Sequence, residues 1–563
     1  MEKKFTLFNT KDLIPRSAGL FNGQIVYTRA LFGKDCISGV IVGVVALPLA
    51  MAFSIAAGGS PAQGLWTAII AGFFISALGG SRYQIGGPTG AFVIIIFGVI
   101  SRHGMGGLLA ATILAGLLLC VMGLCGLGKF IKYIPYPVTT GFTTGIGVLI
   151  FSQQIKDFFG LDIAQSSPEF FTKWIEYFKA LPTTDIPTLA AGVATVVIIV
   201  LARIFLPQIP GAVVAVFGVT AAAFALHLNI ETIASRFGGI PRVIPLPVLP
   251  PVSWQIIVGV FPDAVTIALL AAIESLLSAV VADGMTGDNH NSNTELIAQG
   301  LGNIASGLFG GIPATGAIAR TATNIKSGAV SPVSGIVHAA ALALFVLFLA
   351  PAASMIPLSC LSAVLIVVSW DMSNVRRFIR IIKTAPKSDA SVLITTFALT
   401  VIVDLTFAVE VGFVLAVILF LRRMIAVAGI KAENDEVIEQ LAFGHNHEKE
   451  ADYIHSLAKK DTEVYEINGP FFFGVADMLQ DTLRKVSKTP KKIILRMRNV
   501  PAIDSSGIAA LESLLLDCKK NKVTLIITEV HDQPRSALLK SGFFEQIGGR
   551  NVTDSLDDAL ELP

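Results

Sequence analysis

Two short, Gly/Pro-interrupted hydrophobic segments contain residue types that suit the binding of an anion. The first segment reads Gly-Pro-Thr-Gly-Ala-Phe at 87–92, and the second reads Pro-Ala-Thr-Gly-Ala-Ile at 313–318. Thr89 and Thr315 are 226 positions apart, so the segments occupy corresponding places in two halves of the chain. Interrupted hydrophobic segments at corresponding positions are the best sequence indicator of a secondary transporter's binding site.

A helix that begins inside a membrane presents its unpaired N–H groups and its positive dipole end to the bilayer midplane. Such helix starts bind anions. We therefore predict that two half-helix starts bind a small inorganic or organic anion, through Thr89, Gly90, Ala91, Thr315, Gly316 and Ala317. Coincidence is the alternative, because Thr-Gly also occurs at 140–141 and 144–145.

Glu274 is the candidate site for a coupling ion. It is the only ionisable residue between Ala264 and Val281. An acidic residue in a bilayer costs about 2.5–3.5 kcal/mol on insertion scales, so it is a functional candidate by default. Burial favours the protonated form of a carboxyl group, which would let Glu274 bind and release a proton. Ser278 lies one helical turn later on the same face. The alternative is a structural carboxylate paired with a donor such as Arg320.

Arg320 lies five residues into the second half-helix. A cation there strengthens the field of the helix end and raises the local anion concentration. Alternatively, Arg320 lies at the cytoplasmic side and only pairs with an acidic residue. His290 is expected in a cytoplasmic loop without ligand partners, and His338 is expected to be a packing residue. The five cysteines show no metal-binding or disulfide spacing. We expect no metal and no cofactor besides the coupling ion, a proton or alternatively sodium.

Fourteen hydrophobic segments, several of them short, must position these residues. The mean hydropathy is +0.71 and charged residues make up 15%, against about 25% in globular chains, so we predict a polytopic α-helical membrane protein. Repeat one (about 35–230) is expected to contain segments at 36–57, 64–80, 88–101, 107–126, 138–152, 188–206 and 211–228. Repeat two (about 260–430) is expected to contain segments at 261–282, 296–311, 315–326, 333–350, 357–370, 388–405 and 408–421. Seven segments per half invert the second copy relative to the first.

Lys and Arg residues indicate which loops are cytoplasmic. They gather in the N-terminal arm (1–34), in the loop after the twelfth segment and at the end of the last segment. These three places share one face in a fourteen-segment arrangement. We therefore expect a multi-pass protein of the inner (plasma) membrane with both termini in the cytoplasm, and a loop at 156–187 on the outer surface. Twelve spans with two re-entrant segments would give the same sidedness.

The composition changes at the end of the transporter region (35–430). Residues 431–461 form a charged connector, and residues 462–563 alternate strand and helix patterns. Strands are predicted at 464–467, 492–497 and 523–528, and helices at 476–486, 507–521, 534–541 and 555–562. This order indicates a small cytoplasmic α/β module with a parallel or mixed sheet. Asp504 and the serines after it form a helix N-cap in the simplest interpretation.

Several motifs resemble those of the sulfate-permease-type (SulP, solute carrier family 26) anion transporters. They are Ala46–Phe53, Gly64–Trp66, Gly86–Ala91 and Thr315–Asn324, and the tail at Val500–Gly507 resembles the STAS domain that these transporters carry. The resemblance implies core and gate domains, a homodimer and elevator-type alternating access. It also implies that Phe53 and Phe92 line the anion site, although plain core packing is an equally simple role. Leu49 stands where many animal members have Gln, so a polar contact to the anion is absent there.

The family's coupling carboxylate falls on Glu274. Sodium-coupled bicarbonate carriers are similar but have Asp there and Thr four residues later, whereas this chain has Glu274 and Ser278. The resemblance therefore favours a proton over sodium. The loop at 504–507 also resembles the phosphorylated loop of STAS proteins that antagonise anti-sigma factors, with Ser506 as the acceptor. In that interpretation a cytoplasmic partner binds the STAS domain.

Three functions follow from these features. The first is a proton-coupled symporter or exchanger for sulfate or a related oxyanion, the second a passive anion channel, and the third a membrane sensor that signals through its STAS domain. A channel has no need of an intramembrane carboxylate, and a sensor has no need of two intact half-helix motifs. The sequence shows no catalytic triad, phosphate-cradling loop or nucleic-acid-binding patch. We therefore expect neither an enzyme nor a nucleic-acid partner, but an anion, the lipid bilayer and a second copy of the chain.

Overall fold

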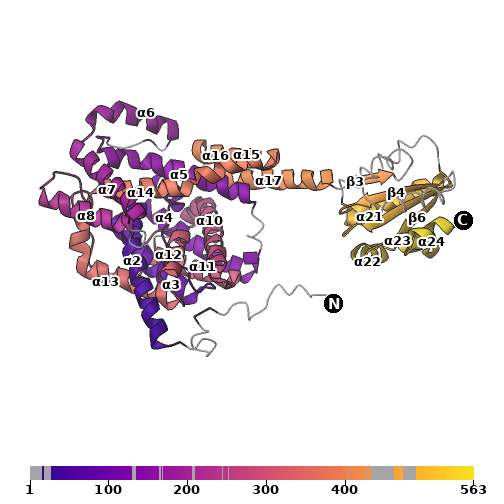
Figure 1. Ribbon diagram of the computed structural model, residues 1–563, viewed down its shortest axis with the longest axis horizontal. Coiled ribbons are helices and arrows are strands. Elements are labelled where there is room, and N and C mark those ends of the chain that lie inside the picture. The colour runs from indigo at the N-terminus through magenta and orange to yellow at the C-terminus, as the bar shows by residue number, and fades with distance from the viewer. Residues whose placement is uncertain are drawn as a thin grey trace. The chain divides into compact units, whose positions relative to one another are not determined.

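The computed structural model describes most of the transporter region and most of the tail. The described residues are 15–17, 27–129, 135–163, 167, 169–205, 210–243, 245–250, 253–403, 405–427, 429–432, 462–472 and 490–562. The chain divides into two compact units, Met1–Ala416 and Val417–Pro563 (Figure 1). The predicted N-terminal arm and charged connector lie mostly outside the described residues.

Helices, most of them apolar, make up most of the first unit. They are α2 (Arg29–Ala56), α3 (Pro61–Leu78), α4 (Phe92–Leu124), α5 (Tyr136–Phe159), α6 (Phe170–Ala180), η3 (Leu181–Thr183), α7 (Ile186–Phe205), α8 (Gly211–Ala225), α9 (Ile233–Phe237), α10 (Trp254–Thr286), α11 (Ser292–Leu308), α12 (Ile318–Lys326), α13 (Val333–Ser354), α14 (Leu358–Ser373), α15 (Val375–Thr384), α16 (Lys387–Ile402) and α17 (Leu405–Val427), which continues into the second unit. A helix pairs its backbone groups internally, as a bilayer requires.

The predicted helical membrane fold is confirmed. Among the described residues, seven stretches are long and apolar enough to cross a membrane, namely α2, α3, α4, α7, α10, α13 and the stretch Leu358–Thr384 that contains α14 and α15. The other predicted segments coincide with α5, α8, α11, α12, α16 and α17, or with the second part of α4. The short helices α6, α9 and α15 were not predicted, because their lengths fall below that of a membrane-spanning run.

Both interrupted segments have a short strand before a helix. β1 (Gly86–Gly87) pairs antiparallel with β2 (Thr315–Gly316), after which α4 begins at Phe92 and α12 at Ile318. The helices therefore begin later than the predicted starts at 88 and 315. The predicted segments 88–101 and 107–126 join into α4, with a break at Gly104, whose φ of +67° lies in the left-handed region that favours glycine.

The far end of each half-helix is held by a carboxylate from the opposite repeat. Asp35 of α2 is fully buried and accepts hydrogen bonds from the backbone N–H groups of Val330 (2.7 Å) and Ser331 (3.2 Å), just after α12. Asp263 of α10 accepts a hydrogen bond of 2.6 Å from Arg102, at the end of the first half-helix. We name these two contacts the far-end clamps.

The far-end clamps are related by one offset in the sequence. His103 also faces Asp263, with 3.6 Å between Nε2 and Oδ2. An offset of 228 positions relates Asp35 to Asp263, Arg102 to Val330 and His103 to Ser331. The carboxylates at matching places, Asp35 and Asp263, therefore both contact the end of a half-helix from the other repeat, as expected for an inverted repeat.

The second unit contains a mixed sheet covered by helices. Its strands follow the order β3 (Gly429–Ala432), β4 (Thr462–Asn468), β5 (Lys492–Asn499), β6 (Thr524–Thr528) and β7 (Val552–Thr553). β3 runs antiparallel to β4, and the remaining neighbours are parallel. The helices of this unit are α21 (Ser505–Lys520), α22 (Asp532–Lys540), α23 (Phe543–Ile547), η4 (Gly549–Asn551) and α24 (Leu556–Glu561).

Alternate residues of the central strands pack on opposite faces of the sheet. Tyr465, Leu495 and Ile527 pack with α21, α22 and α23, whereas Ile494 and Ile526 pack with α24. The predicted α/β module is therefore confirmed. β3, β7 and α23 were not predicted because they are short, and the predicted helix 476–486 lies outside the described residues.

Candidate functional site

The start of the first half-helix lies beside the membrane carboxylate. Thr89 Oγ1 donates a 2.9 Å hydrogen bond to Glu274 Oε2 of α10. Both residues are half-buried. Thr89 is predicted to bind the anion and Glu274 the coupling ion, and the structure brings the two side chains into direct contact.

The start of the second half-helix also contacts α10. Thr315 is fully buried, and its hydroxyl donates a 2.8 Å hydrogen bond to the carbonyl oxygen of Ala271. Ala271 and Glu274 lie about one turn apart on α10 and therefore share a face. α10 thus receives a threonine hydroxyl from each half-helix start, but only Thr89 reaches the carboxylate.

The strand pairing changes which backbone donors remain for an anion. The Ala317 N–H donates a 2.9 Å hydrogen bond to the carbonyl oxygen of Ile85, so this predicted donor is used within the protein. The first turn of a helix has N–H groups without intrahelical acceptors. In α12 these are the N–H groups of residues 318–320, one turn beyond the predicted position.

Gly316 lies in very close contact with a buried amide. A Cβ atom at Gly316 would lie 1.7 Å from Gln84 Nε2 and 3.2 Å from the Cα atom of Ser275. Gln84 cannot withdraw freely, because Nε2 donates to the carbonyl oxygen of Ser275 (3.0 Å) and to its Oγ (2.9 Å). Only glycine fits at this crossing of β2 and α10.

Arg320 is a buried cation without an acidic partner among the described residues. It is 3% exposed, and its Nη2 donates a 2.6 Å hydrogen bond to the carbonyl oxygen of Pro88. Its Nη1 is buried without a hydrogen-bond partner and would lie 2.5 Å from a Cβ atom at Gly87. The alternative in which Arg320 pairs with Glu274 is not observed, and its charge remains available to attract an anion.

Ser278 connects two helices. It is fully buried, and its hydroxyl donates to Thr321 Oγ1 at 3.2 Å, which in turn accepts the N–H of Ile85 at 3.1 Å. Ser278 therefore joins α10 to α12 and to the residue before β1. Its predicted role as a ligand of the coupling ion stays a prediction.

The aromatic candidates and Gly90 lie in a packed region. Phe92 is fully buried and Phe53 is 5% exposed. A Cβ atom at Gly90 would lie 3.2 Å from Phe53, 2.9 Å from Ile150 of α5 and 3.0 Å from Met372 of α14. Ala91 is fully buried as the N-terminal neighbour of α4. This conformation packs α5 and α14 against the start of the first half-helix. Both aromatic residues belong to the buried core, and their role in lining the anion site stays a prediction.

Sequence reasoning missed Glu295 of α11. This carboxylate is fully buried and accepts hydrogen bonds from the backbone N–H groups of Gly80 (3.0 Å) and Ser81 (3.2 Å). It also accepts hydrogen bonds from Ser275 Oγ (3.1 Å) and Gln299 Nε2 (2.9 Å). A polar stripe on α11 is the signal that could have revealed it, namely the fully buried residues Glu295, Gln299, Asn303 and Ser306.

We expect Glu295→Ala to lower the thermal stability of the protein strongly. The exchange leaves buried donors unpaired, and each costs about 1–3 kcal/mol. Glu295→Gln should lose less, because one acceptor oxygen remains. Thermal unfolding in detergent measures both, with Asp162→Ala as a control at an exposed carboxylate. Equal melting temperatures for Glu295→Ala and the control would contradict this role.

The remaining candidates have local partners or packing roles. His290, expected without ligand partners, lies with Nδ1 2.6 Å from Asp283 Oδ2 and Nε2 2.9 Å from Ser292 Oγ, which holds the loop before α11. His338 is fully buried in α13, as a packing residue would be, but neither ring nitrogen has a hydrogen-bond partner among the described residues, so the expected satisfied histidine is not observed. Asp504 caps α21 by accepting the Gly507 N–H at 2.9 Å, which confirms the N-cap, and phosphorylation of Ser506 stays a prediction.

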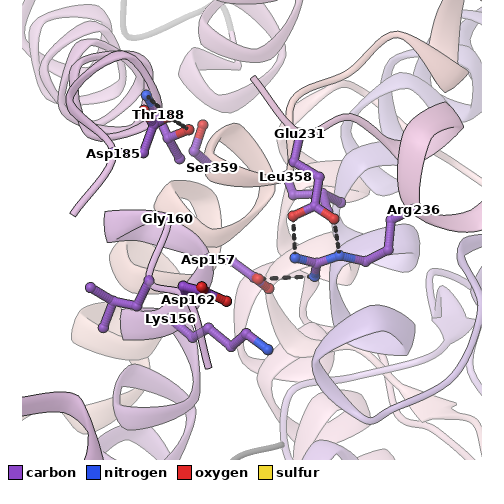
Figure 2. A pocket seen from close by; sticks show the side chains of 11 residues that line it. Lys156, Asp157, Gly160, Asp162, Asp185, Thr188, Glu231, Arg236, Leu358 and Ser359 are labelled. Carbon is purple, nitrogen blue, oxygen red and sulfur yellow. Dashed lines mark hydrogen bonds and ion pairs between the residues drawn. The ribbon is translucent and has the colours of Figure 1, made fainter. Parts of the chain in front are cut away.

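One cavity lies away from these residues. Figure 2 shows a pocket of about 290 Å³ between the end of α5, the starts of α7 and α14, and α9. Arg236 crosses it and pairs with Asp157 at 2.9 Å and with Glu231. None of the predicted site residues lines it, so this pocket is not the candidate anion site.

Two interrupted helices whose starts both contact α10 near its membrane carboxylate, inside an inverted repeat, are typical of a secondary transporter. A buried arginine without an acidic partner among the described residues suits an anion. Residues 32–396 match the sulfate permease family, and residues 453–559 match the STAS domain. The chain therefore belongs to the sulfate permease family of anion transporters and is a multi-pass membrane protein.

Relatives cover nearly the whole chain. It is 42% identical over 548 residues to the putative sulfate transporter YvdB of Bacillus subtilis, covering 96% of this chain and 99% of that protein. It is 30% identical over 553 residues to the bicarbonate transporter BicA of Synechocystis, covering 95% of each. The family consists of transporters rather than enzymes.

Two solved structures share the fold. The anion transporter Slc26a9 of the mouse, in the inward-facing state, matches with a TM-score of 0.83 at 19% identity, covering 100% of this chain and 95% of that chain. The transmembrane domain of a cyanobacterial BicA matches with a TM-score of 0.59 at 31% identity, covering 70% of this chain and 98% of that chain.

Proposed function

We propose that this protein takes up sulfate or a related oxyanion together with protons, by elevator-type alternating access. The hydrogen bond of 2.9 Å from Thr89 to Glu274 carries the proposal, because it joins the anion-binding half-helix to the membrane carboxylate. The similarity to a putative sulfate transporter supports the choice of substrate.

The Thr89–Glu274 pair provides a coupling mechanism. When Glu274 is ionised, its Oε2 accepts the Thr89 hydroxyl, and its negative charge repels an anion. Protonation removes that charge and releases the Thr89 hydroxyl to donate to the anion. Each ligand then raises the affinity of the other, by the same factor.

Arg320 and the start of α12 supply the opposing charge. The guanidinium is fixed by its bond to Pro88, so its orientation needs no rearrangement when the anion binds. The first-turn N–H groups of α12 add the positive end of a helix dipole. A core domain that carries these groups would move against a gate domain containing α5 and α14, and the contact of Ile150 and Met372 with Gly90 would then separate.

The proposal includes the oligomeric state of the protein and its orientation in the membrane. We expect a homodimer in the inner membrane, with both termini in the cytoplasm. The basic residues after α14 and at the end of α17 support this orientation.

Sodium-dependent bicarbonate transport is the second candidate. Its support is the 30% identity to a bicarbonate transporter along 95% of this chain. The two candidates differ in the coupling ion, since a sodium site needs several oxygen ligands whereas a proton needs one carboxylate.

Uptake of labelled sulfate into proteoliposomes separates the candidates. We expect unlabelled sulfate to compete, and uptake to rise as the outside pH falls, without sodium. Bicarbonate, chloride and small dicarboxylates serve as competitors, and empty liposomes serve as the control. If bicarbonate alone is transported, in a sodium-dependent manner and without response to a pH gradient, the second candidate replaces the first.

A further inference from the structure

α15 is a short helix at the end of a membrane-spanning segment. It follows α14 after a turn at Asn374, whose φ is 39°, and it precedes α16, which begins at Lys387 after Pro386. α15 is attached to α14 at its start and to α16 at its end, and both of these helices belong to the membrane region. α15 is therefore restricted to the membrane surface. Figure 1 shows it beside α16.

α15 has one apolar and one basic face. Val375, Phe378, Ile379 and Ile382 recur at helical spacing and form the apolar face. Arg376, Arg377, Arg380 and Lys383 occupy the other side of the same three turns. No acidic residue occurs between 372 and 388 in the sequence, whereas Lys387 adds a further cation.

Two contacts fix the orientation of α15 on the protein. The ring centroid of Phe378 lies 5.2 Å from that of Phe397 in α16. The guanidinium of Arg377 lies 4.4 Å from the ring centroid of Tyr136 in α5. α15 is therefore held along one edge by two neighbouring helices, and the rest of its surface remains open.

The open surface is both apolar and cationic. No residue of α15 is buried, and Val375, Ile379 and Ile382 are 38%, 45% and 40% exposed. Arg376, Arg380 and Lys383 are also exposed, and no ion pair involves them among the described residues.

We propose that α15 lies in the interface of the bilayer and binds the headgroups of anionic phospholipids. Amphipathic helices with a basic face lie in the interface with their apolar side chains among the acyl chains. Clustered Lys and Arg next to a membrane span attract anionic headgroups. Trp370, 71% exposed and one turn from the end of α14, has the exposure of an interfacial anchor.

A lipid fits this surface better than a protein partner. The apolar side chains and the cations lie on a helix that is tethered at the bilayer surface, so lipid covers both without a further binding event. The binding concerns the membrane around the protein and does not depend on which anion is transported.

The experiment uses the full-length protein in phosphatidylcholine nanodiscs with a stepwise increase in phosphatidylglycerol. Native mass spectrometry measures the phosphatidylglycerol that remains bound. The test variant is Arg376→Gln/Arg380→Gln/Lys383→Gln. The control variant Lys520→Gln/Lys540→Gln/Arg550→Gln removes the same charge from exposed positions of the second unit.

We expect the test variant to need at least tenfold more phosphatidylglycerol for half-saturation, because each cation near an anionic surface contributes about fivefold. The control should match the unmodified protein, and added salt should weaken binding by the unmodified protein. Equal binding by all three proteins, or an equal loss in both variants, would overturn the proposal. Melting temperatures of the variants establish that each is folded.

Discussion

Gly316→Val is expected to abolish anion uptake. The new Cβ atom would lie 1.7 Å from Gln84 Nε2, and that amide is held by two hydrogen bonds to Ser275. The side chain therefore forces β2 away from α10 and moves the start of α12. Labelled-anion uptake into proteoliposomes measures the effect, and size-exclusion chromatography shows whether the protein still folds.

A control variant and a double variant test whether the loss of uptake comes from the contact between Gly316 and Gln84. Gly218 of α8 has no atom within 4 Å of a Cβ at its position, so Gly218→Val should leave uptake unchanged. The double variant Gly316→Ala/Gln84→Ala removes the clashing amide and should recover part of the uptake that Gly316→Ala loses. If uptake survives in Gly316→Val, the anion site lies elsewhere.

Glu274→Gln is expected to eliminate proton-driven accumulation. Glutamine is permanently neutral like the protonated carboxyl, so anion exchange across the membrane should continue while the response to a pH gradient disappears. In the unmodified protein, binding as well as flux should increase as the outside pH falls, because protonation removes a negative charge beside the anion. Glu274→Asp withdraws the carboxylate by one methylene and should weaken both activities.

The control for Glu274 is an exposed carboxylate, Glu169, whose exchange for Gln should keep the full pH response. Thr89→Val supplies a second measurement. It removes the hydroxyl that contacts Glu274, so anion affinity should fall while some pH response remains. Sodium-dependent uptake that ignores pH in the unmodified protein would make Glu274 a sodium ligand instead.

The sequence predicted the features that depend on local patterns. Glycine and proline interruptions located both half-helix starts to within about one turn, and the isolation of Glu274 in an apolar run identified the carboxylate. Hydrophobic runs identified most helices, because a bilayer requires long apolar segments. Short apolar runs that alternate with helical patterns in the tail predicted its central strands.

Features that depend on distant contacts could not be predicted in this way. The pairing of β1 with β2 uses the Ala317 N–H, which no local pattern indicates. Thr89 and Thr315 occupy equivalent positions, yet only Thr89 contacts a carboxylate, because they meet α10 one turn apart. Glu295 was overlooked because the predicted segment began at residue 296, whereas α11 begins at Ser292, and the backbone partners of its carboxylate lie more than 200 residues away in the sequence.

The far-end clamps also determine when the protein can complete its folding during synthesis. The first half-helix ends at a contact with Asp263, which the ribosome adds about 160 residues after Arg102. The second half-helix ends at a contact with Asp35. The ribosome adds Asp35 long before it reaches the second half-helix. Neither repeat therefore contains all the contacts of its own half-helix, and a chain stopped between the repeats would hold an incomplete site. Two separately expressed halves should each be sensitive to proteolysis, and should become resistant only when they are made together.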